Sequence, residues 1–81
     1  MNKMNYENYE TSDFGLLIYL SINFPVIEVE KHNPRRAKFT FEKTPELLEA
    51  IEGYWNETAL ISPYKYFSQM KKIKSRLYEN A

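Results

Sequence analysis

Two hydroxyl residues that directly precede prolines constrain the fold of this chain more than any other feature. Thr44-Pro45 and Ser62-Pro63 each head a run in which apolar residues recur at helical spacing. Ser or Thr at an N-cap accepts a backbone N–H, and proline at the first helical position has no N–H to lose. The two pairs therefore predict one helix from Pro45 to about Glu57 and another from Pro63 to about Tyr78.

A third helix is predicted closer to the N-terminus. The cap residues Thr11-Ser12-Asp13 precede a stretch from Phe14 to Ile22 in which nearly every position is apolar. A helix that is apolar all round is buried on most sides, so we expect this one at the centre, between a sheet and the other helices. Gly15 lies in its first turn, where a missing side chain lets another element come close. A buried strand over 16–20 is the alternative.

Two short segments alternate apolar and polar residues, as strands do: Val26–Lys31 and Ala37–Glu42. They predict an antiparallel hairpin whose loop, residues 32–36, is basic. Because a two-stranded hairpin is marginal by itself, its open edges need protection. The N-terminal arm could add a strand, a second copy of the chain could pair with the edge as a homodimer, or charged residues could shield it.

The register of the hairpin follows from the same alternation. Pairing Val29 with Phe39, and Ile27 with Phe41, gathers the apolar side chains on one face. A slip of one residue would bring glutamates onto that face, so we expect this register.

The predicted order is α-β-β-α-α, an α+β fold. The 81 residues suit one domain, which we place at residues 11–81 behind a mobile N-terminal arm at residues 1–10. With no cysteine, disulfides and cysteine-based zinc sites are excluded. The longest apolar run ends at Pro25 and is too short to span a membrane, and the first ten residues lack an apolar signal core. We expect a cytoplasmic protein, in the host cytoplasm if the gene is viral.

The residues that could carry catalysis are few. His32 is the single histidine and lies in the hairpin loop, while Asp13 is the single aspartate and serves as a helix cap. No nucleophile, base and orienting group can be assembled from them. Three helical glutamates are expected to form a solvated acidic face (Glu46, Glu49 and Glu52). We therefore expect no enzymatic activity, no metal site and no cofactor.

Basic residues form the first candidate site. They would bind nucleic acid if the hairpin and the helix from Pro63 converge, because cations neutralise phosphates and nearby rings stack on bases. The alternative is ordinary charge segregation, with the acidic helix from Pro45 beside the basic one. A net charge of zero argues against a general polyanion binder. The residues are Arg35, Arg36 and Lys38 at the hairpin, and Lys65, Lys71, Lys72, Lys74 and Arg76 on the helix.

Aromatic residues form the second candidate site, where one helix ends and the next begins. Trp and Tyr dominate the residues that carry binding energy in protein interfaces. We expect a protein-interaction surface at Tyr54, Trp55, Tyr64 and Tyr66.

Three stretches together resemble a family of short, uncharacterised proteins from phages and prokaryotic genomes. They are Tyr9-Glu10-Thr11-Ser12-Asp13-Phe14, Phe39-Thr40-Phe41-Glu42-Lys43-Thr44-Pro45-Glu46-Leu47, and Tyr54-Trp55-Asn56-Glu57 followed by Ser62-Pro63-Tyr64. The resemblance covers residues 9–78 and implies a stand-alone domain from a virus or mobile element, without implying an activity. The leading hypothesis is a non-enzymatic binding protein that docks on a protein partner and modulates host or defence machinery. The alternatives are nucleic-acid binding and a structural homo-oligomer.

Overall fold

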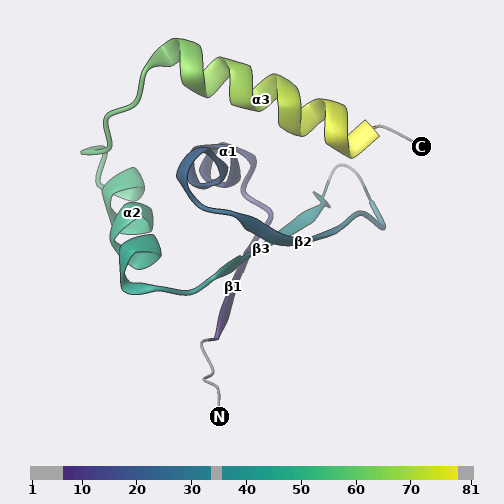
Figure 1. The fold of residues 1–81 in the computed structure, drawn as a ribbon, viewed down its shortest axis with the longest axis horizontal. Coiled ribbons are helices and arrows are strands. Elements are labelled where there is room, and N and C mark those ends of the chain that lie inside the picture. Colours follow the sequence, from purple (N-terminus) through teal and green to yellow (C-terminus); the bar gives the residue numbers. More distant parts are fainter. Residues whose placement is uncertain (1–6, 34–35, 79–81) are drawn as a thin grey trace.

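A three-stranded antiparallel sheet and three helices form the fold in the computed structural model, which describes residues 7–33 and 36–78 (Figure 1). The elements in chain order are β1 (Asn8–Thr11), α1 (Phe14–Asn23), β2 (Val26–Glu30), β3 (Lys38–Glu42), α2 (Pro45–Trp55) and α3 (Pro63–Tyr78). The predicted α+β class is confirmed, and β1 adds a strand before the predicted order.

The predicted helix starts are confirmed by their capping bonds. The backbone N–H of Leu47 donates to Thr44 Oγ1 at 3.1 Å, and that of Lys65 donates to Ser62 Oγ at 3.3 Å. In α1 the cap is Asp13, whose Oδ1 accepts the Leu16 N–H at 3.0 Å. Each cap satisfies a backbone donor that has no partner inside its helix.

Helix α2 ends two residues earlier than the sequence predicted. Glu57 has a φ of 64°, in the left-handed region that stops a helix. The Thr58 N–H then bonds the Gly53 carbonyl at 2.9 Å, and the Glu57 N–H bonds the Tyr54 carbonyl at 3.2 Å. These two bonds form a Schellman motif, which normally has glycine where this chain has Glu57.

The sheet has the order β1-β3-β2, so β3 is its central strand. Strand β1 pairs antiparallel with β3, with Tyr9 opposite Phe41 and Thr11 opposite Phe39. The first of the three alternatives for the hairpin edge is therefore the observed one, since the N-terminal arm supplies a strand. Residues 8–10 of the predicted arm thus belong to β1. Residues 1–6 lie outside the described part of the chain.

The hairpin register is confirmed at Val29, which lies opposite Phe39, and is wrong at Ile27. A bulge between Val26 and Glu28 adds one residue to β2, so Val26 takes the position opposite Phe41. Ile27 is displaced from the inner face, and 53% of its surface stays exposed. Simple alternation could not show this, because a bulge shifts every residue before it by one position.

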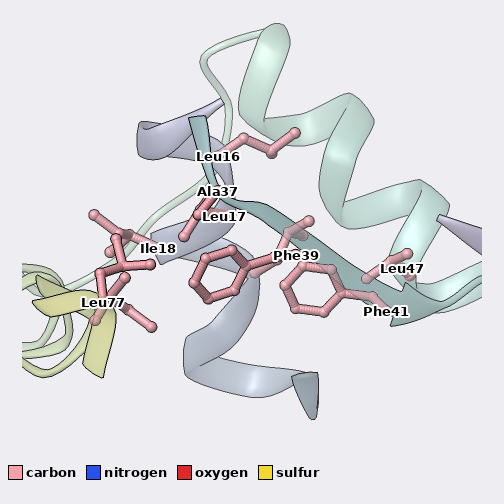
Figure 2. Close-up of a cluster of buried hydrophobic side chains, with 10 residues drawn as sticks. Leu16, Leu17, Ile18, Ala37, Phe39, Phe41, Leu47 and Leu77 are labelled. Atoms are coloured by element: carbon pink, nitrogen blue, oxygen red, sulfur yellow. The ribbon is translucent and has the colours of Figure 1, made fainter. Parts of the chain in front are cut away.

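The core lies around α1, as predicted. In Figure 1, α1 occupies the centre, with α3 on one side, α2 on another and the sheet on the third. Figure 2 shows side chains from α1, β3, α2 and α3 meeting in one cluster. The buried hydrophobic residues are Leu16, Leu17, Ile18, Leu20, Ala37, Phe39, Phe41, Leu47, Ile73 and Leu77.

Three large apolar residues that follow the helical spacing of α2 and α3 are exposed. They are Leu48 and Trp55 on α2, and Phe67 on α3. Both helices pack mainly on α1, and this contact covers only a narrow strip of each. On α3 the inward strip consists of Tyr66, Met70, Ile73 and Leu77.

Candidate interaction surface

Large apolar side chains are exposed where α2 passes into α3. Four of them lie between residues 55 and 67, and we call this set the aromatic surface: Trp55, Leu60, Tyr64 and Phe67. Leu60 and Tyr64 are the most exposed, at 93% and 80%. Single exposed apolar residues are ordinary, but a group of them in one region marks an interaction site or an aggregation liability. The segment that carries them joins α2 to α3 at one corner of the molecule (Figure 1).

The four residues of the predicted protein interface lie in two different settings. Trp55 and Tyr64 are exposed, whereas Tyr54 and Tyr66 are half-buried and pack on the core. The Tyr66 hydroxyl donates to the Gly15 carbonyl at 3.0 Å. A Cβ atom on Gly15 would overlap the Tyr54 hydroxyl, so this glycine allows the close approach that its position predicted. The binding role of all four residues stays a prediction.

The buried end of Tyr66 changes its acid–base behaviour. Burial raises the pKa of the Tyr66 phenol above its ordinary value of 10.0, and the Tyr54 hydroxyl and the Asp13 carboxylate raise it further. Each of these causes disfavours the phenolate. Tyr66 is therefore held as a neutral hydrogen-bond donor to α1.

Five cations line α3, and the sequence from 63 to 78 contains no acidic residue to balance them. All five are exposed, and no ion pair among the described residues involves them. Lys71 Nζ lies 5.1 Å from the centroid of the Phe67 ring, which places a cation at the border of the aromatic surface. No described ion pair links the acidic face of α2 to these cations either. The five residues are Lys65, Lys71, Lys72, Lys74 and Arg76.

The cations predicted at the hairpin are only partly available. Arg35 lies outside the described residues, and Arg36 is exposed. Lys38 Nζ lies 3.7 Å from a carboxylate oxygen of Glu10 and 3.7 Å from one of Glu30, so two acids already offset its charge. Lys38 thus differs from the cations of α3, which have no acid partner among the described residues.

A hydrogen bond joins the hairpin to α3 through a residue that the sequence did not single out. Lys31 Nζ, directly after β2, donates to the Arg76 carbonyl at 3.2 Å. A cation at a helix C-terminus stabilises the last carbonyls and the helix dipole. Only the pairing of β2 with β3 and the direction of α3 put Lys31 there, so no local sequence signal could have shown it.

His32 and the glutamates are the residues that the sequence offers for catalysis or metal binding. Within 7–33 and 36–78, no three His, Cys, Asp or Glu side chains gather as a metal ion would require. His32 Nε2 lies 3.0 Å from Glu30 Oε2 on the exposed hairpin.

No helix within residues 7–33 and 36–78 is both long and apolar enough to cross a membrane.

Comparison with known protein families matches residues 6–79 to one family, described as "Domain of unknown function (DUF5659)". Comparisons with curated proteins and with solved structures give no match. The match spans almost the whole fold, from just before β1 to just after α3.

Proposed function

The chain belongs to this DUF5659 family, and from that premise we propose that it is a non-enzymatic binding protein that docks on a protein partner. The observation that carries the proposal is the aromatic surface, in which four large apolar side chains between residues 55 and 67 are exposed. A chain of this size has few large apolar residues for its core. Leaving four of them outside the core weakens folding unless a partner covers them.

The charges around the aromatic surface define the partner's chemistry. Lys71 contacts the Phe67 ring, and Lys65 follows Tyr64 on α3. Both cations lack an acid partner among the described residues. Interfaces combine an apolar centre with a polar rim of complementary charge. The proposed partner is therefore a protein surface that is apolar at its centre and acidic at its rim.

Site-specific photo-crosslinking in cells tests this proposal. Benzoylphenylalanine at position 64 should capture a distinct protein, whereas the same group at Ser75, exposed on α3 outside the aromatic surface, should not. With that protein purified, Tyr64→Ala and Phe67→Ala should each weaken its affinity at least tenfold, as buried aromatic contacts do. Leu48→Ala, which truncates a 45% exposed apolar side chain outside the surface, is the control.

The proposal fails if positions 64 and 75 capture the same proteins to the same extent. It also fails if the purified protein binds the Tyr64→Ala and Phe67→Ala variants as tightly as it binds the unchanged chain. Both outcomes would leave the aromatic surface without a partner.

The cellular setting is part of the same proposal. The resemblance to phage and prokaryotic proteins supports a role in a virus or mobile element, acting in the cytoplasm on host or defence machinery. A crosslinked partner from that machinery would support this setting, and a partner from the virus's own assembly would replace it.

A second candidate function, nucleic-acid binding, is favoured by the five unbalanced cations of α3. Fluorescence anisotropy with labelled single- and double-stranded DNA and RNA at two salt concentrations tests it. Salt-sensitive, sub-micromolar binding that Lys72→Glu and Arg36→Glu abolish would support this function over protein docking. Glu49→Gln on α2 provides a control that alters charge outside the basic helix. The absence of binding at low salt would rule this candidate out.

A further inference from the structure

A pocket of about 210 Å³ opens between the start of α1, the start of β3 and the last turns of α3. It lies at the opposite end of α3 from the aromatic surface. The residues that line it are Ser12, Phe14, Leu17, Ala37, Phe39, Lys74, Leu77 and Tyr78.

The floor of the pocket is apolar and rigidly held. Leu17, Ala37, Phe39 and Leu77 are all buried and belong to the central core cluster, which fixes their positions from three different elements (Figure 2). The rings of Phe14 and Tyr78 form walls nearer the surface. An apolar cavity of about 150 Å³ is already large enough to bind benzene. This floor can therefore accept one aromatic ring or a short alkyl chain.

The charge in the described lining of the pocket is positive. Of the lining residues in 7–33 and 36–78, Lys74 is the one with a charged side chain, and no ion pair among the described residues involves it. Ser12 places a hydroxyl in the same lining, and its Oγ makes only a long contact of 3.5 Å to the Arg36 carbonyl. A lysine ammonium and a hydroxyl can both donate hydrogen bonds to a carboxylate. The apolar floor and these donors together match a molecule with an apolar body and an anionic head.

We propose that this pocket binds a small amphipathic carboxylate, with its apolar body against Leu17, Phe39 and Leu77 and its carboxylate at Lys74 and Ser12. The volume sets an upper limit on the ligand, because pockets for drug-sized molecules start at about 300 Å³. The class therefore comprises short- and medium-chain fatty acids and single-ring aromatic acids. This inference does not depend on the aromatic surface, so either proposal can fail without the other.

NMR titration of the full-length, ¹⁵N-labelled protein tests the inference with octanoate and benzoate. Saturable shifts are expected at the amides of Leu17, Ala37 and Leu77 with at least one of the two acids. Whichever acid binds more tightly identifies an alkyl or an aromatic body. The neutral analogues octanol and benzyl alcohol should bind at least tenfold more weakly, because they lack the charge that Lys74 recognises.

A matched pair of variants isolates the cation. Lys74→Met keeps most of the apolar stem and removes the charge, and it should weaken binding of the acid at least tenfold. Lys72→Met removes the same charge from the same helix but lies outside the pocket lining, so it should change affinity less than twofold. Ala37→Leu fills the floor and should abolish binding of both acids. If Ala37→Leu does not fold, the lysine pair still decides the question.

Two outcomes would overturn the inference. One is the absence of saturable shifts in the pocket with both acids at about 10 mM. The other is an equal loss of affinity in Lys74→Met and Lys72→Met, which would show that the acids respond to the overall charge of α3.

Discussion

Replacing Gly15 with alanine tests how α1 and α2 approach each other. A Cβ atom at this position would overlap the Tyr54 hydroxyl, while its next contacts, at 3.4 Å to the Tyr66 hydroxyl and 3.6 Å to the Tyr54 Cζ, are tolerable. Tyr54 cannot swing aside freely, because its ring lies 5.7 Å from the ring of Tyr19 and 5.0 Å from that of Trp55. The substitution therefore forces a packed aromatic ring to shift.

Two opposing effects set the expected change in the free energy of unfolding. Alanine is favoured over glycine inside a helix by up to about 1 kcal/mol, and less in the first turn, where position 15 lies. Overpacking of a packed site costs about 1–3 kcal/mol. We expect Gly15→Ala to lower the free energy of unfolding by about 1 kcal/mol, since the overlap outweighs the helix preference.

The background variant Tyr54→Phe makes the test more specific, because it removes only the hydroxyl oxygen that a Cβ atom at position 15 would overlap. In that background Gly15→Ala should be neutral or stabilising by up to about 1 kcal/mol. The four proteins form a double-mutant cycle with an expected coupling of about 1–3 kcal/mol between positions 15 and 54. Urea unfolding followed by far-UV circular dichroism supplies the four free energies. If Gly15→Ala has the same effect in both backgrounds within about 0.3 kcal/mol, the argument from close approach is wrong.

Two further predictions concern single side chains. Tyr66→Phe should cost about 1 kcal/mol at pH 7 through loss of its bond to the Gly15 carbonyl. Because the folded-state pKa of Tyr66 is raised above 10.0, its stabilisation is complete below about pH 10 and is lost as the pH rises through the folded pKa. Urea unfolding from pH 8 to 11 should show a shallower alkaline decline in Tyr66→Phe, and an unchanged decline would contradict this. Glu57→Gly should raise the melting temperature by roughly 4–8 °C for about 1 kcal/mol, because glycine suits a φ of 64°. Glu52→Gly, inside α2, should lower it instead.

The helix boundaries were the most predictable part of this fold. Thr44, Ser62 and Asp13 act through bonds to residues three positions away, so the sequence alone contains the whole interaction. The end of α2 was less predictable, because Glu57 occupies a position that usually requires glycine. Helix starts that use common capping residues could therefore be predicted, whereas the end of α2, where glutamate replaces the usual glycine, could not.

Features that depend on distant contacts were missed or misplaced. The bulge that exposes Ile27 depends on how β2 meets β3. The exposure of Phe67 depends on which side of α3 faces α1, and its neighbour Tyr66 takes the inward place. Both residues fit the expected periodicity within one position, which is the limit of what periodicity can resolve.

The candidate sites also combine features that follow from local sequence with features that depend on distant contacts. The basic character of α3 follows from its composition, and its lack of balancing acids was visible in the sequence. The ion pair between Lys38 and Glu10 depends on the pairing of β1 with β3, and β1 lies far from the hairpin along the chain. The pocket beside Lys74 forms where three elements meet, so no local sequence pattern could indicate it.

The central place of β3 has a consequence for synthesis on the ribosome. Strands β1 and β2 are not neighbours, and each pairs only with β3. During translation both strands are synthesised before Lys38–Glu42, so neither can form its hydrogen bonds within the sheet until β3 follows. At about 5–20 residues per second, the end of β3 is made roughly 2–6 s after the end of β1. The two ladders therefore depend on the same late strand, and neither edge strand can pair before β3 becomes available.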